Sequence, residues 1–329
     1  MAEHRPNMLF ISSDQQHWRT LGYLNPEVKT PNLDRLVQRG VTFHRAYTVN
    51  PTCTPTRASW ITGLYPSQHG AYSLGTKLME TVPTVGDVFQ RHGYATALVG
   101  KAHFQPLKGT DEYSSLESYP ILHDLGFWRR FHGPFYGFGH VELARNHTDE
   151  SHVGQHYALW MEEKGHSDWR KYFQPDHRRL EPGEPWEIPE EIHYNAWIAE
   201  RTNALMEQYA ESRQPFFLWA SFFDPHPPYM VPEPYARMYD PARVSVPEYR
   251  EGEFDDKPPY FKLSQEKHPD FSAFLEPDGN GIHGAGSHLR SRETKAKNIA
   301  AMYGMVTMLD AYIGKILDQL DALDLVRNT

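Results

Sequence analysis

The sequence predicts an α/β fold in which a mostly parallel central sheet carries helices on both faces. Short apolar runs that read as buried strands alternate with segments whose apolar residues recur at helical spacing. This alternation is typical of parallel sheets covered by helices. The 329 residues are 39% apolar, which is enough for a large core. In such sheets we expect the chemistry at the carboxyl ends of the strands.

The first third of the chain holds most of the clear elements. Residues 7–14 read as a short buried strand that ends at a carboxylate. The segment 30–40 reads as a helix, with Thr30 as its N-cap and Gly40 as its stop. A second strand is predicted directly afterwards, over 41–47. Further predicted elements are a helix over 55–63, a helix over 84–93 and a strand over 94–101.

The rest of the chain alternates between clear and irregular segments. Residues 104–190 show no clean period, and we interpret them as an insertion over the sheet that shapes the pocket. A helix near 192–212 precedes a strongly apolar strand over 215–222. Residues 241–291 read as a second insertion of long loops, a candidate lid. A long amphipathic helix over 293–323 follows. Its apolar seam consists of Met302, Val306, Leu309, Ile313, Ile316 and Leu320.

Composition excludes several classes of function. The net charge of −9 argues against nucleic acid or an anionic membrane as the main partner, because either requires a clustered basic surface. No stretch is long enough to span a bilayer, and the first residues do not read as a signal peptide, so we expect a cytoplasmic protein. Composition leaves the oligomeric state open.

The single cysteine of the chain lies in the segment CTPTR, which begins at Cys53. One cysteine cannot form an intrachain disulfide, so it is a buried apolar residue, a reactive thiol or a modification site. It stands just before a predicted helix, whose free N–H groups point back toward it, and Arg57 follows one turn later. This arrangement suits an oxidised or anionic group at residue 53.

The pattern Cys-x-Pro-x-Arg resembles the signature of the type I sulfatases. These belong to the alkaline phosphatase superfamily, are related to arylsulfatases and phosphonate monoester hydrolases, and convert the cysteine to formylglycine. Neighbouring segments are similar as well, namely LFISSDQQ, TPNLDRLVQRGVTFHRAY, TGLYPSQHG, VGKAHF and FFDPHPPY. The resemblance covers most of residues 7–105, with islands near 215–240 and 293–320. It implies an alkaline phosphatase-like sheet and maturation by a formylglycine-generating enzyme.

The resemblance also implies the ligands of a metal. Asp14, Gln15 and residue 53 would hold one divalent ion, with Ca²⁺ as the first expectation and Mg²⁺ or Mn²⁺ as the next.

The same resemblance assigns roles in catalysis. Cleavage of a sulfate ester develops negative charge on oxygen, so the site needs cations and donors. Arg57 and Lys101 would stabilise the nucleophile and the bound anion. His226 would protonate the leaving oxygen, and His103 would take the proton whose loss releases sulfate.

Three hypotheses for function follow. The first is a hydrolase of a small or aryl sulfate ester. The second is a phosphonate monoester hydrolase or phosphodiesterase of the same superfamily; that pocket tends to replace the Lys and His of the GKAH segment, so Lys101 and His103 favour sulfate. The third is a non-catalytic relative that binds anions.

The sequence departs from the family in one respect. The resemblance implies a later Asp-His-Gly type segment that completes the metal site, together with a further lysine, and the motif DHG does not occur here. We therefore expect residues 1–329 to be the N-terminal catalytic domain of a longer protein, without the C-terminal metal-site segment and small subdomain.

Overall fold

The computed structural model describes residues 5–145, 152–173, 183–274 and 287–329. Its strands are β1 (Met8–Ser12), β2 (Ala95–Gly100), β3 (His140–Leu143) and β4 (Phe216–Ser221). The helices before β3 are α1 (Pro31–Arg39), α2 (Cys53–Thr62), α3 (Pro66–His69), α4 (Val85–Arg91) and α5 (Leu125–Trp128). Those after it are α6 (Gln155–Glu163), α7 (Tyr194–Ser212), α8 (Pro259–Leu263) and α9 (Arg292–Ala322).

The four described strands form one sheet in the order β1-β4-β2-β3, and every neighbouring pair is parallel. One row of the register runs across the whole sheet, through Phe10, Trp219, Leu98 and Val141. Because all strands point the same way, their carboxyl ends meet at one edge. The predicted parallel sheet is confirmed.

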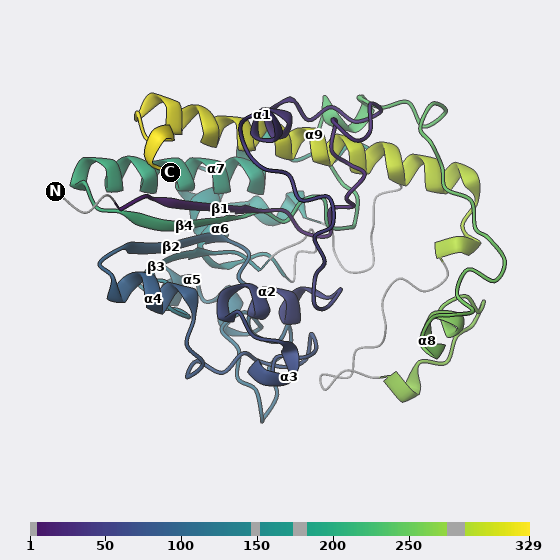
Figure 1. Ribbon diagram of the computed structural model, residues 1–329, viewed down its shortest axis with the longest axis horizontal. Helices are drawn as coiled ribbons and strands as arrows, with labels where there is room; N and C mark the ends of the chain where they lie inside the picture. Colours follow the sequence, from purple (N-terminus) through teal and green to yellow (C-terminus); the bar gives the residue numbers. More distant parts are fainter. Residues whose placement is uncertain (1–4, 146–151, 174–182, 275–286) are drawn as a thin grey trace.

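Helices cover both faces of the sheet, as predicted (Figure 1). Alternate strand residues point to opposite faces, so Val99 and Leu218 pack toward α7 and α9, whereas Leu98 and Trp219 pack toward α2. The predicted seam of the long helix is confirmed over most of its length, because Val306, Leu309, Ile313, Ile316 and Leu320 are buried. No helix in the described part of the chain combines the length and apolarity that a bilayer crossing needs.

The predicted strand over 41–47 is wrong. This segment has no regular secondary structure, and Val41, Phe43 and Tyr47 are 82%, 79% and 85% exposed. An alternating apolar pattern forms a strand only where a neighbouring strand supplies hydrogen bonds and a face to pack against. Among the described residues, no strand pairs with this segment.

β3 and α6 lie within residues 104–190, where the sequence pattern predicts no element. The pattern of β3 is hidden because His140 and Glu142 are polar, although Glu142 is only 5% exposed. The carboxylate is buried because Arg201 of α7 binds it through two nitrogens, at 2.7 and 2.9 Å. An ion pair therefore takes the place of an apolar contact between β3 and α7.

We expect Glu142→Gln to reduce the dependence of the free energy of unfolding on pH. Burial by itself raises the pKa of Glu142, but hydrogen bonds from His140 and Arg201 outweigh it and lower the pKa to about 2, from 4.5. Its stabilising contribution is therefore present above pH 4.5 and is lost as the pH falls toward 2. Urea unfolding should show a loss on the order of 2 kcal/mol at pH 7. A loss of the same size at pH 2 would contradict this account.

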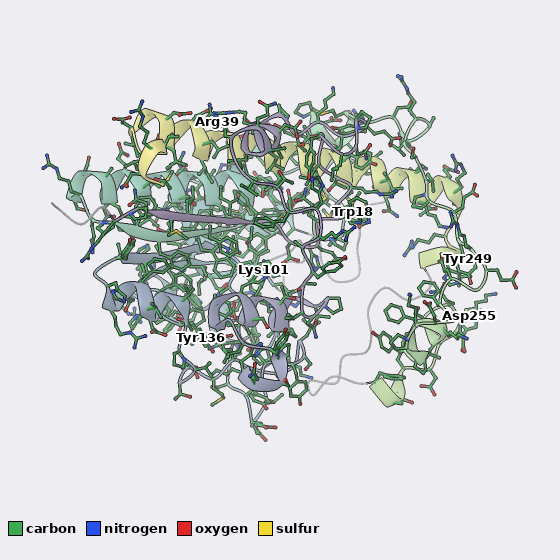
Figure 2. The ribbon with its side chains drawn as sticks, in the orientation of Figure 1. Trp18, Arg39, Lys101, Tyr136, Tyr249 and Asp255 are labelled. Atoms are coloured by element: carbon green, nitrogen blue, oxygen red, sulfur yellow. The ribbon has the colours of Figure 1, made fainter. Side chains whose placement is uncertain are left out.

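The region of the predicted lid lies away from the sheet. In Figure 1, α8 lies at the lower right, below the N-terminal end of α9 and apart from the sheet. Figure 2 places Tyr249 and Asp255 in the same outlying part. Residues 275–286, which belong to the predicted lid, lie outside the described residues. The lid therefore stays a prediction.

Candidate active site

Ionisable side chains follow all four strands at the carboxyl edge of the sheet. Asp14 follows β1, Lys101 and His103 follow β2, Arg145 follows β3, and His226 follows β4. Four of these five residues were predicted from the sequence. Arg145 was not, because the pattern of β3, the strand that precedes it, is hidden by polar residues. Figure 2 shows Lys101 within the body of the molecule.

Helix α2 brings residue 53 to this edge. Cys53 is the first residue of the helix rather than the residue before it, and Thr52 is the N-cap. The thiol Sγ lies 4.0 Å from Oδ1 of Asp14. The first N–H groups of a helix have no partner within it and carry partial positive charge, so this position favours an anion. Arg57, one turn later, is only 2% exposed.

Three side chains converge closely enough to hold a metal ion. One ligand atom each from Asp14, Cys53 and His226 lies within 4.8 Å of the other two. A carboxylate oxygen and an imidazole nitrogen fit a divalent cation, and a hydrated aldehyde at residue 53 would offer oxygen in place of sulfur. The predicted ligand Gln15 is exposed and has a φ of 51°. The part of Gln15 in metal binding stays a prediction.

A buried charge network surrounds Asp14. Its Oδ2 accepts hydrogen bonds from Nη2 of Arg57 at 2.9 Å and binds Nζ of Lys101 at 2.8 Å. Arg57 Nη1 donates to the Lys101 carbonyl oxygen and to Ser221 Oγ, both at 2.8 Å. Ser221 Oγ in turn donates to the Lys101 carbonyl oxygen at 2.7 Å. The network ties the ends of β1, β2 and β4 to α2.

Ser221 is a further site residue that the sequence pattern did not single out, although it is the last residue of β4 and lies within the predicted strand over 215–222. The rule that strand ends carry the chemistry could have found it. Gly100 makes its approach possible, because a Cβ at Gly100 would lie 2.0 Å from the Ser221 carbonyl oxygen. That oxygen accepts a hydrogen bond from the Lys101 N–H at 3.0 Å. A side chain at residue 100 would therefore displace both Lys101 and Ser221.

The charges of the network determine the protonation of Asp14. Burial by itself raises its pKa, but the positive charges of Lys101 and Arg57 outweigh burial and hold the pKa well below its usual value. Asp14 is therefore ionised in the folded protein. Two positive charges face one negative charge, so the cluster carries net positive charge and can bind an anion.

His226 is neutral in this environment. Burial and the positive charge of Lys101 lower its pKa to about 4. Its Nδ1 lies 2.5 Å from the carbonyl oxygen of Pro227, which places the proton on Nδ1. The neutral ring therefore carries its lone pair on Nε2, the atom that can act as an acceptor or a metal ligand. Negative charge on a nearby oxygen would raise the proton affinity of this nitrogen.

His103 is buried beside the same charges. Burial lowers its pKa well below the usual value, and the positive charge of Lys101 and then that of Arg145 lower it further. It is 2% exposed, and neither ring nitrogen has a hydrogen-bond partner among the described residues. A buried histidine with both nitrogens unpartnered can accept a proton from a group that enters the site.

Comparison with known proteins adds independent information. A protein-family model described as Sulfatase matches residues 6–329. An arylsulfatase of Clostridium perfringens is 27% identical over 341 residues, which cover 99% of this chain and 61% of that protein. A choline-sulfatase of Rhizobium meliloti is 25% identical over 342 residues, which cover 100% of this chain and 56% of that protein.

Among solved structures, the phosphonate monoester hydrolase of Agrobacterium radiobacter matches with a TM-score of 0.72 and 26% identity. The match covers 99% of this chain and 61% of that one. The chain therefore spans 56% to 61% of the length of these three relatives.

Proposed function

Because the chain belongs to the sulfatase family, we propose that it carries the nucleophile, the cations and part of the metal site of a hydrolase that cleaves a small or aryl sulfate ester. The observation that carries this proposal is the convergence of Cys53, Arg57 and Lys101 on the buried carboxylate of Asp14. A nucleophile beside a net positive cluster suits a substrate that gains negative charge as it reacts.

The nucleophile of this proposal is residue 53 after conversion to formylglycine. A formylglycine-generating enzyme is the partner that this maturation requires. The hydrated aldehyde supplies two hydroxyl groups, one to attack sulfur and one to release the product. The N-terminus of α2 and the charges of Arg57 and Lys101 stabilise an ionised hydroxyl at this position.

Two histidines divide the proton transfers. The bond from the residue 53 oxygen to sulfur forms as the bond from sulfur to the leaving oxygen breaks. His226 takes up a proton at Nε2 when the anionic ester binds, because the negative charge raises the pKa of the ring, and gives that proton to the leaving oxygen. His103 then takes the proton of the second hydroxyl, so that the aldehyde forms again and sulfate departs with the attacking oxygen. Water then hydrates the aldehyde for the next cycle.

Asp14 and residue 53 belong to the cluster whose ligand atoms lie close enough to hold a divalent metal. The family resemblance adds Gln15 as a further proposed ligand. Ca²⁺ is the proposed ion, with Mg²⁺ or Mn²⁺ next, because hard oxygen ligands dominate this set. When bound, it would supply positive charge to the sulfate oxygens. We propose the cytoplasm as the compartment, since one cysteine in 329 residues is typical of proteins in reducing compartments.

The likeness to a phosphonate monoester hydrolase supports a second candidate activity. The test is the ratio of kcat/KM for an aryl sulfate to that for a phenyl phosphonate monoester, measured on the full-length protein expressed beside a formylglycine-generating enzyme. We expect the ratio to exceed one, because Lys101 and His103 are both present at the site. A ratio below one would assign the phosphonate activity instead. Turnover of neither ester, together with an unmodified thiol at Cys53, would indicate the anion-binding relative.

We expect His226→Ala to impair poor leaving groups more than good ones. Only a poor leaving oxygen needs a proton in the transition state, so the loss in kcat/KM should rise from about tenfold to about 10³-fold as the pKa of the leaving phenol rises. A series of substituted phenyl sulfates measures this slope. Equal losses across the series would show that His226 does not transfer the proton. They would favour a role as a metal ligand, because His226 lies in the cluster with Asp14 and Cys53.

A further inference from the structure

Glu117 has no role in the proposal so far, yet its carboxylate binds the segment that carries His103. Its Oε1 accepts a hydrogen bond from the N–H of His103 at 2.6 Å. Its Oε2 accepts from the N–H groups of Phe104 and Gln105, each at 2.9 Å. Three consecutive backbone donors thus enclose one side chain, an arrangement that selects an anion. Glu117 is 1% exposed, so water does not compete for these bonds.

The conformation of His103 explains why the backbone of residues 103–105 needs a stabilising contact. Its φ of 56° lies in the left-handed region, which is unfavourable for a residue other than glycine. The same left-handed step turns the following N–H groups toward a common point, where the Glu117 carboxylate lies. Binding of the carboxylate therefore offsets the cost of the backbone conformation.

Within the part of the chain that the structure describes, no hydrogen bond fixes the ring of His103. Both nitrogens are buried and without a partner among the described residues. The direction of the ring is therefore set by the backbone and by packing, and the backbone is held by Glu117. His103 follows β2 at the carboxyl edge of the sheet, two residues after Lys101, and the charges of Lys101, Arg145 and Arg57 act on its ring.

A second contact joins the same two segments. The N–H of Leu116 donates to Oε1 of the Gln105 side chain at 2.6 Å. The segment around Glu117 and the segment after β2 are thus linked in both directions, by a side chain from each side. Loss of the Glu117 carboxylate would remove the bonds to the amides of residues 103–105 and leave the Gln105 contact together with the bond from Ser115 Oγ to the Pro106 carbonyl oxygen.

From these contacts we propose that Glu117 is a positioning residue that holds His103 in its left-handed conformation and so directs an imidazole nitrogen to the proton that leaves residue 53. The inference rests on the proposed function, because it assigns Glu117 to the release of sulfate. Glu117 itself touches no reacting atom. Its effect should appear in the step that His103 performs and not in the attack on sulfur.

The first test does not depend on activity. The measurement is hydrogen exchange of the full-length protein, followed by mass spectrometry. In Glu117→Ala, the peptide that contains the amides of residues 103–105 should exchange about tenfold faster than in the wild type, because each of these three amides loses a charged acceptor. Glu117→Gln keeps one acceptor oxygen and should fall between wild type and Ala. The matched control is Glu142→Gln, which removes a buried carboxylate from β3 and should leave this peptide unchanged. Unchanged exchange in Glu117→Ala would overturn the inference.

The second test separates positioning from general damage to the fold. With an aryl sulfate, Glu117→Ala should give a burst of released phenol and then a slow steady state, because the sulfate ester at residue 53 accumulates. We expect kcat and KM to fall together by about 100-fold, with kcat/KM retained within about threefold. Glu117→Gln should lose less. A fall in kcat/KM without a burst would indicate a structural role only and would overturn the inference.

The two tests also distinguish the inference from the proposed function. If the wild-type protein hydrolyses neither a sulfate nor a phosphonate ester, the proposed function fails, and with it the role of Glu117 in release. The exchange measurement still decides whether Glu117 stabilises the backbone of residues 103–105. Should Glu117→Ala fail to fold, the isosteric Glu117→Gln carries both measurements.

Discussion

Replacement of Cys53 by serine should stop turnover after a single cycle. Serine has one hydroxyl, which can attack sulfur but cannot release sulfate by loss of a second proton at the same carbon. We expect kcat to fall by about 10⁴-fold or more, similar to the loss of a nucleophile in other covalent enzymes. The peptide that contains residue 53 should retain a sulfate ester, visible by mass spectrometry. Turnover at the wild-type rate would exclude the aldehyde mechanism.

Two controls make this result specific. Cys53→Ala should show the same loss of turnover but no sulfate on the peptide, because it has no nucleophile. In the wild type, the same peptide should carry the formylglycine mass when the protein is expressed beside the generating enzyme. An intact, alkylatable thiol under those conditions would argue for the non-catalytic, anion-binding relative.

Replacement of Asp14 by asparagine should cause the largest loss of stability among single substitutions at the site. The change leaves the buried charges of Arg57 and Lys101 without their shared carboxylate, and these residues are 2% and 1% exposed. Breaking one side of a buried ion pair costs about 3 to 5 kcal/mol. Urea unfolding with a chelator present measures this loss without any contribution from metal binding.

Two control variants differ from Asp14→Asn in how many positive charges lose their partner and in how deeply those charges are buried. Glu142→Gln breaks a pair with Arg201, which is 36% exposed, so solvent can rehydrate that cation and the loss should be smaller. The double substitution Asp14→Asn with Lys101→Met removes one of the two stranded charges and should recover part of the stability. A loss below about 1 kcal/mol in Asp14→Asn would show that the network is not what stabilises this edge of the sheet.

Elements with their own local signals were predicted well. The strand before Asp14 and the strand that ends at Gly100 are apolar runs, and α1 has Thr30 at its N-cap and Gly40 at its end, as expected. The elements that were predicted wrongly are those whose structure depends on residues far away in the sequence. β3 is a strand because β2 pairs with it and Arg201 neutralises Glu142, whereas residues 41–47 have the pattern of a strand but no neighbour to pair with.

The candidate site shows the same division. Cys53, Arg57, Lys101 and Asp14 could be found from a motif and from the ends of apolar runs, and the structure brings them together. Their roles in catalysis stay predictions. Ser221, Arg145 and Glu117 belong to no motif that the sequence displays. They matter because of what the folded chain places beside them, for example the Ser221 hydroxyl against the Arg57 guanidinium.

The sequence by itself determined the class of fold, the family resemblance and the residue types at the carboxyl edge, because periodicity, caps and a short motif are local properties of the chain. Only the tertiary structure decided how those groups are charged and aimed. Burial beside Lys101 and Arg57 lowers the pKa of Asp14, and three N–H groups around the Glu117 carboxylate hold the turn of His103. Desolvation and charge pairing depend on which residues meet in space, and a linear sequence does not contain those distances.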